Sequence, residues 1–247
     1  MLDSKSKFRV IQTGQKSAQE NMAIDEALLK NFKENDLPIL RLYTWENSFT
    51  VGISQDISNY SFTKEFNGNY AKRVTGGGVL FHGHDLSYSL IIPTIILKEF
   101  SVKESYEKIC TFLLNFYKNL GLDCMYVKDN DTIKLSKNEY CQVGFEAYDI
   151  LVNCTKIGGN AQRRTKLAIF QHGSIPVKCT KIEKYKTQIG STLEDFDINL
   201  EFEEVSKRVI ESFEKSFNVE LVFSDLTKEE NKKKEILLKE KYDYSNI

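Results

Sequence analysis

The sequence predicts an α+β protein in which helices flank a mixed or antiparallel sheet. Short apolar segments of strand length are interrupted by helices without a strict alternation of the two, which is typical of α+β proteins. The chain has 247 residues, 41% hydrophobic and 28% charged, enough to bury a full core. We find no internal repeat and no linker. We therefore expect residues 1–247 to form a single domain, with no separate accessory domain.

The first hundred residues predict one helix followed by strands. Ser17-Ala18-Gln19-Glu20 is a capping box, in which serine and glutamate satisfy free N–H groups at a helix start. Apolar residues at helical spacing extend this helix to Phe32. One or two helical turns are expected at residues 61–66. Strand composition bounded by turn residues appears at residues 39–45, 49–53 and 87–93.

The rest of the chain predicts three more helices and four strands. A second capping box, Ser101-Val102-Lys103-Glu104, begins a helix whose apolar face includes Cys110, which we interpret as a core residue. A polar surface loop is expected at residues 128–139, with a short strand at 132–135. The last helix is mostly Lys and Glu and is expected to be solvated. Strands are expected at residues 123–128, 148–152 and 167–175, and helices at 101–120, 203–217 and 227–242.

Composition excludes several functional classes. The net charge is −1 with both signs mixed along the chain, which gives no general argument for a nucleic-acid partner. No apolar run of membrane-spanning length and no signal sequence is present, so we expect a cytoplasmic protein with no membrane partner. The five cysteines are an odd number without C-x-x-C spacing, which argues against disulfides and a zinc site. We therefore expect free thiols, one of which can be a nucleophile, and no metal ligands.

The segment from Lys72 to Asp85 is the first candidate for a ligand site. Three consecutive glycines, Gly76, Gly77 and Gly78, allow the backbone to run close beneath a ligand. Arg73 precedes them, and Thr75 lies between. The planar, positively charged guanidinium group of an arginine can bind a carboxylate or phosphate. His82, His84 and Asp85 follow, and a plain hairpin has no need for titratable groups at its mouth. No P-loop or dinucleotide-binding glycine pattern is present, so we expect a different kind of anion or carbonyl site.

The second candidate segment begins at Lys156. This lysine directly precedes an isoleucine and two glycines, so it lies on a backbone that can approach a ligand closely. A surface lysine in a hairpin remains the alternative. Each of the two glycine segments combines a cation with a backbone that a ligand can approach closely. This favours a ligand with a small anionic or carbonyl head group, bound by both segments. The residues proposed from this segment are Lys156, Gly158, Gly159, Asn160 and Ala161.

Together, several segments resemble those of the lipoate-protein ligases and octanoyltransferases, which share a fold with biotin-protein ligase. The resemblance covers the chain from about residue 8 to 180, and the joint occurrence of its motifs makes it specific. It implies a biotin/lipoate-ligase-like catalytic domain. It also implies that Lys156 contacts the acyl group or its activated carboxyl and that the Arg73 segment, with His82, lines the same pocket. The matching segments are 21–29, 40–45, 72–78 with His82, 156–162 and 171–175.

Within this family, Cys141 favours a transferase. It precedes Lys156 by fifteen residues, a position that resembles the nucleophile of LipM-type octanoyltransferases. Such an enzyme takes an octanoyl or lipoyl group from acyl carrier protein onto its cysteine and passes it to a lysine of lipoyl domains of 2-oxoacid dehydrogenases or of glycine cleavage H protein. It needs no cofactor. Catalytic roles are thereby implied for Cys141 and Lys156.

Two alternatives stay open at this point. A lipoate-protein ligase would use ATP and Mg²⁺ to make lipoyl-adenylate, with Cys141 as a bystander. Gly78 favours that alternative, because LipM-type enzymes often have an arginine at this position. The other alternative is a non-catalytic relative that binds lipoate or a lipoyl domain.

Overall fold

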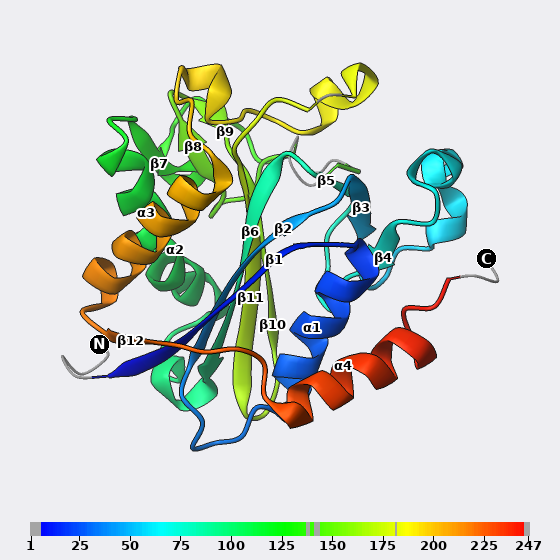
Figure 1. The fold of residues 1–247 in the computed structure, drawn as a ribbon. Coiled ribbons are helices and arrows are strands. Elements are labelled where there is room, and N and C mark those ends of the chain that lie inside the picture. The colour runs from blue at the N-terminus through cyan, green and yellow to red at the C-terminus, as the bar shows by residue number, and fades with distance from the viewer. Residues whose placement is uncertain (1–5, 137–138, 141–143, 181, 245–247) are drawn as a thin grey trace.

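The computed structural model describes residues 6–136, 139–140, 144–180 and 182–244, and a six-stranded sheet runs through its centre (Figure 1). The strands are β1 (Lys7–Lys16), β2 (Ile39–Trp45), β6 (Asp85–Pro93), β10 (Gly159–Arg164), β11 (Ala168–Pro176) and β12 (Glu220–Phe223). They stand in the order β10-β11-β6-β2-β1-β12. The neighbours from β2 to β10 pair antiparallel, whereas β1 pairs in parallel with β2 and β12. The sheet is mixed, as the sequence predicts.

Four α-helices cover the two faces of this sheet. They are α1 (Ala18–Asn31), α2 (Val102–Asn119), α3 (Phe202–Phe217) and α4 (Lys228–Glu240). Figure 1 shows α2 and α3 on one face and α1 and α4 on the other. Side chains alternate accordingly along β2: Leu40 and Leu42 join the core under α2 and α3, whereas Ile39 and Tyr43 pack toward α1. Among the described residues, no helix combines the length and apolarity that crossing a membrane requires.

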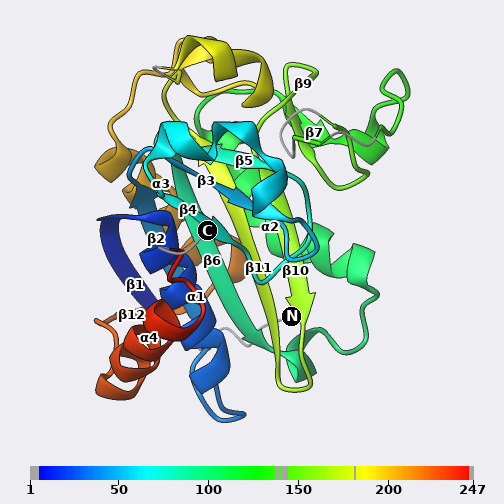
Figure 2. The same ribbon diagram turned by 90° about the vertical axis from the view of Figure 1, so that its right-hand side faces the viewer.

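Two three-stranded sheets lie beside one end of the main sheet (Figure 2). The first contains β3 (Ser48–Val51), β4 (Tyr70–Lys72) and β5 (Leu80–His82), and the second β7 (Cys124–Tyr126), β8 (Ile150–Val152) and β9 (Thr155–Lys156). The glycine segment connects β4 to β5, and Lys156 ends β9. Both candidate segments are thereby placed at the same end of the molecule.

Short 3₁₀ helices complete the chain. They are η1 (Ile57–Asn59), η2 (Ser61–Phe66), η3 (Thr94–Leu97), η4 (Val127–Asp129), η5 (Glu183–Gln188) and η6 (Glu194–Phe196). The helical turns expected at residues 61–66 are η2. The strand expected at residues 132–135 is absent from the described structure. Instead, the N–H groups of Thr132 and Ile133 donate to the side-chain oxygen of Asn130, which holds a turn.

The C-terminal helix α4 is not simply solvated, contrary to the prediction. Its lysine-rich face is exposed, but Leu237 is buried against α1, and Glu230 is buried where it pairs with Arg9. Just beyond the helix, the Tyr242 hydroxyl donates to Glu26 at 2.6 Å. Composition alone did not reveal this packing, because the apolar residues that dock the helix, Leu237 and Leu238, are few among its Lys and Glu residues.

Candidate active site

A cavity of about 370 Å³ opens where the glycine segment, β5 and the start of β10 meet. The structure brings most predicted site residues to its wall: Arg73, Gly76, Gly77, Gly78, His82, Lys156, Gly159, Asn160 and Ala161. Thr75 and Gly158 are buried behind the wall. Thr75 contacts the wall indirectly, because its Oγ1 lies 2.7 Å from Nε2 of His172, which lines the cavity. Cys141 lies outside the described residues.

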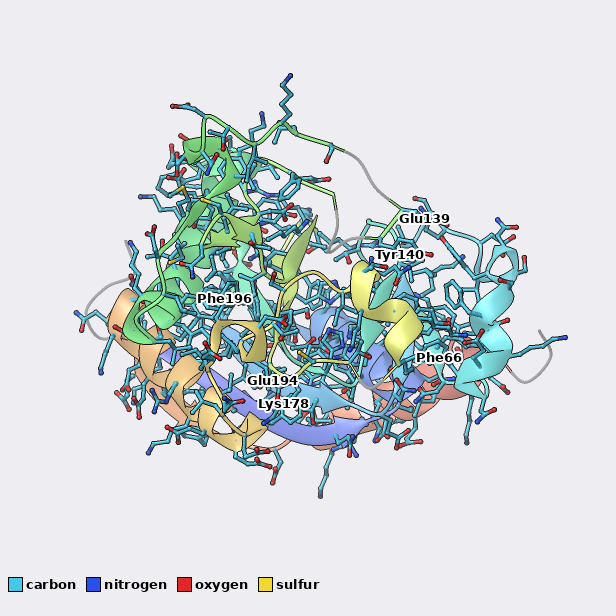
Figure 3. All side chains as sticks on the ribbon, turned by 90° about the horizontal axis from the view of Figure 1, so that it is seen from above. Phe66, Glu139, Tyr140, Lys178, Glu194 and Phe196 are labelled. Atoms are coloured by element: carbon cyan, nitrogen blue, oxygen red, sulfur yellow. The ribbon has the colours of Figure 1, made fainter. Side chains whose placement is uncertain are left out.

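The structure gives a different reason for glycine at each of the three positions. A Cβ on Gly76 would meet no atom within 4 Å, so this position leaves open space at the cavity wall. Gly77 has a φ of 105°, which side chains disfavour. At Gly78 a Cβ would lie 1.8 Å from the carbonyl oxygen of Glu139. Figure 3 shows Glu139 and Tyr140 between the strands around β7 and the 3₁₀ turns η1 and η2. Gly78 thus lets the chain that leads to Cys141 pass close to the glycine loop.

Arg73 holds this loop in place. Its side chain is buried, with Nη1 donating to Thr50 Oγ1 at 2.9 Å and Nη2 donating to the carbonyls of Gly76 and Gly78 at 3.2 and 2.9 Å. The sequence suggested that the Arg73 guanidinium binds an anion. In the structure this guanidinium binds the backbone of the glycine loop, and its direct contact with a ligand stays a prediction.

His82 is fixed by contacts on every side. Its ring stacks on Trp45 with centroids 3.8 Å apart, and its Nε2 lies 2.9 Å from Thr50 Oγ1. The other ring nitrogen, Nδ1, lies 3.1 Å from Asp85 Oδ2. Because an ionised carboxylate only accepts hydrogen bonds, Nδ1 carries a proton and donates to Asp85. These contacts orient the ring at the cavity wall.

Lys156 has a carboxylate partner that the sequence did not reveal. Its Nζ donates to Asp149 Oδ2 at 2.6 Å and to the Gly144 carbonyl at 2.5 Å, and the side chain is 4% exposed. Burial raises the pKa of Asp149, although Lys156 acts in the opposite direction. Gly144 follows the segment that contains Cys141. The buried ammonium is therefore tied to the backbone within three residues of the proposed nucleophile.

A buried ion pair supports the cavity from beneath. Arg41 is fully buried and donates to Asp25 Oδ1 at 2.6 Å and to the Asn21 side-chain oxygen at 2.6 Å. Asp25 also accepts from Tyr43 at 2.9 Å and lies 3.6 Å from His172 Nδ1, and both of these residues line the cavity. Burial acts to raise the pKa of Asp25, but Arg41 and His172 together hold it below its usual value. The network thus fixes two wall side chains.

These supporting residues were missed because sequence reasoning looked for groups that touch a ligand. Asp25 and Arg41 lie in segments that carried the family resemblance, and His172 lies in another. A usable signal was present: charged residues in otherwise apolar elements are rarely buried unless they are paired. Asp149, at the start of an apolar strand, carried the same signal.

Within the described part of the chain, no group of three or more His, Cys, Asp or Glu side chains is arranged to hold a metal. Four cysteines in that part are free thiols: Cys110, Cys124, Cys154 and Cys179. Cys110 is buried on α2, as predicted, and burial raises the pKa of its thiol to about 12. It is therefore no thiolate nucleophile at neutral pH.

The chain is similar to known proteins in both sequence and fold. The family model of the lipoyl protein ligase A/B catalytic domain matches residues 17–217. The chain is 33% identical to octanoyltransferase LipM of Bacillus cereus, over 97% of this chain and 96% of that protein. Two solved structures share the fold: lipoate-protein ligase A bound with ATP, and a bi-partite lipoate protein ligase of Thermoplasma acidophilum studied with its E2 lipoyl domain. The first has a TM-score of 0.76 and 23% sequence identity, and the match covers 96% of this chain and 96% of that one. The second has a TM-score of 0.72 and 22% identity, and the match covers 96% of this chain and 93% of that one.

Proposed function

Because the chain belongs to the lipoyl protein ligase A/B catalytic-domain family, we propose that it transfers an octanoyl group from acyl carrier protein to a lysine of a lipoyl domain. The acceptors we propose are lipoyl domains of 2-oxoacid dehydrogenases or glycine cleavage H protein. The acyl group passes through a thioester on Cys141. The observation that carries this mechanism is the buried Lys156 ammonium at the cavity wall, bonded to Gly144 beside the Cys141 segment.

The first step is attack of the Cys141 thiolate on the carbonyl carbon of the donor thioester. A new C–S bond forms, the donor C–S bond breaks, and the carrier leaves as a thiolate, which takes up a proton equal to the one that the Cys141 thiol released. Lys156 supports this step in two ways: a nearby cation favours the thiolate, and its N–H groups can hold the carbonyl oxygen as negative charge develops. In the second step the acceptor amine attacks the enzyme thioester and restores the thiol.

The cavity suits an acyl chain of moderate length. Its volume is within the range of small-molecule sites, and apolar side chains of Met22, Tyr43, Trp45 and Leu80 contribute to its wall. This reaction needs neither ATP nor Mg²⁺, which the ligase alternative would require. A thiol nucleophile has to stay reduced, which fits the predicted cytoplasmic location.

The test is intact-mass spectrometry after incubation with octanoyl carrier protein. We expect one octanoyl adduct on the wild type, lost in Cys141→Ala and retained in Cys154→Ala, which removes an exposed free thiol outside the cavity. Lys156→Met should form the adduct slowly. An adduct that persists in Cys141→Ala would refute the acyl-enzyme mechanism, and ATP-dependent lipoylation without any adduct would identify a ligase. If the protein shows neither activity, the non-catalytic alternative remains.

A further inference from the structure

A second cavity of about 450 Å³ opens beside the first. It lies between the start of α2, Leu135 and the segment 145–149 that precedes β8. Five residues line both cavities: Tyr106, Ser136, Glu146, Asp149 and Asn160. The second cavity therefore reaches Asp149, which pairs with Lys156. An occupant of this cavity would lie next to the proposed acyl site, along the five shared residues.

The outer wall of this cavity is apolar. Val102 and Leu135 contribute side chains that are 50% and 63% exposed, and Phe145 and Tyr148 continue the wall inward. The Tyr148 ring stacks near that of Tyr106, with centroids 6.4 Å apart. Apolar side chains exposed in a cavity next to a reaction centre provide a contact surface for a substrate.

The inner end, shared with the first cavity, is acidic. Asp149 Oδ2 binds Lys156 and also accepts from the Glu146 backbone N–H at 2.7 Å. The Glu146 carboxylate is exposed and makes no hydrogen bond or ion pair with the described residues. Besides Asp149, which pairs with Lys156, the shared wall thus carries the Glu146 carboxylate, which can attract a further cation. Lys103 lies on the outer part of the wall and not at this end.

We propose that the second cavity receives the side chain of the acceptor lysine. Its methylenes lie along the apolar wall, and its ammonium approaches Glu146 and Asp149. This inference rests on the transferase function proposed above, and it assigns Glu146 as the group that draws the amine in. A lysine side chain combines an apolar stem with a terminal cation, in the same order as this wall.

The proton balance of this step closes with solvent. The ammonium loses one proton to solvent, and the neutral amine attacks the thioester carbonyl. The C–N bond forms, the C–S bond breaks, and one of the two remaining amine protons ends on the departing sulfur. The pantetheine arm of the donor is neutral near its thioester and gains nothing from the carboxylates, so charge complementarity favours the acceptor.

The experiment separates the two half-reactions. The octanoyl-enzyme is formed with octanoyl carrier protein, isolated, and discharged either by an apo lipoyl domain or by hydroxylamine, a small nucleophile that needs no side-chain pocket. For Glu146→Gln we expect discharge by the lipoyl domain to slow about tenfold, the equivalent of one lost charge contact. Acylation and discharge by hydroxylamine should stay within about twofold of wild type.

Two matched controls accompany this variant. Glu107→Gln removes an acidic side chain from α2, where Glu107 pairs with Lys128 at 3.5 Å and lines neither cavity. Leu135→Lys adds a cation to the outer wall and should raise the apparent KM for the lipoyl domain, whereas Leu167→Lys, at another exposed leucine, should not.

The outcomes are distinguishable. Normal discharge of Glu146→Gln by the lipoyl domain would overturn the proposal, as would slow acylation with normal discharge, which would assign the cavity to the donor arm. Equal slowing with hydroxylamine and the lipoyl domain would also overturn it, because the defect would then lie in the thioester site. If the wild type forms no octanoyl-enzyme, the proposed function itself fails first.

Discussion

Gly78→Ala tests whether the glycine loop positions the nucleophile. The new Cβ would lie 1.8 Å from the Glu139 carbonyl oxygen, whereas ordinary van der Waals contact begins at 3.4 Å. The two backbone segments must therefore separate by about 1.6 Å, the difference between these distances. The same movement weakens the 2.8 Å hydrogen bond from the Val79 N–H to Glu139. Because Cys141 follows Glu139 by two residues, the movement reaches the proposed nucleophile.

Activity should fall far more than stability. A misplacement of about 1 Å typically costs about 100-fold in rate, so octanoyl-enzyme formation should fall by about 100-fold or more. Loss of one backbone hydrogen bond costs about 1 kcal/mol, which lowers the Tm of a chain of this size by about 2–4 °C. Rates are measured by intact-mass spectrometry and the Tm by circular dichroism.

Gly14→Ala provides a stability-matched control. Gly14 has a φ of 64° and lies in β1, where a Cβ would meet no atom within 4 Å. Alanine there costs about 1 kcal/mol in backbone strain and should leave octanoyl-enzyme formation unchanged. A wild-type rate in Gly78→Ala would refute the reasoning, because the close approach would then not place the nucleophile. A Tm loss well beyond that of Gly14→Ala would mean that the glycine serves the fold.

Three further predictions concern stability. Asp25→Asn leaves Arg41 buried without its anion and should cost about 3 kcal/mol or more in denaturant unfolding; a cost below about 1 kcal/mol would show that the pair is not needed. Burial lowers the pKa of His84 from 6.5 to about 4, so between these values the unfolded state binds a proton that the folded state excludes. The free energy of unfolding should therefore fall as the pH drops through this window, and His84→Gln should flatten the decline; an unchanged pH profile would contradict this. Leu237→Ala should cost about 3 kcal/mol if α4 docks as the structure shows, and a loss near zero would restore the picture of a solvated helix.

The predictable elements are those whose pattern is local. Capping boxes at Ser101 and Thr227 form in the structure with both of their hydrogen bonds, because serine or threonine and glutamate lie within one turn. The buried strands β6 and β11 were recognised by apolar composition.

β1 and β12 were not predicted, for two different reasons. In β1 the pairing register shifts between Gln12 and Gln15, so the alternation of side chains that identifies a strand is interrupted. β12 is a four-residue edge strand with only partial burial, and its pairing with the distant β1 leaves no local signal.

The candidate site shows the same limit at the level of single side chains. An arginine before three glycines favours a bound anion when the residues are considered in sequence alone. In the structure Gly77 has a positive φ, and the carbonyls of Gly76 and Gly78, on either side of it, both accept from Arg73. These acceptors compete with a ligand for the guanidinium, and they arise only from the three-dimensional path of the loop. Lys156, by contrast, keeps its ammonium at the cavity wall because Asp149 compensates its charge within the same small sheet region. The sequence could therefore identify which cations reach the cavity, but the division of work between loop support by Arg73 and proposed catalysis by Lys156 depends on partners that are set by the fold.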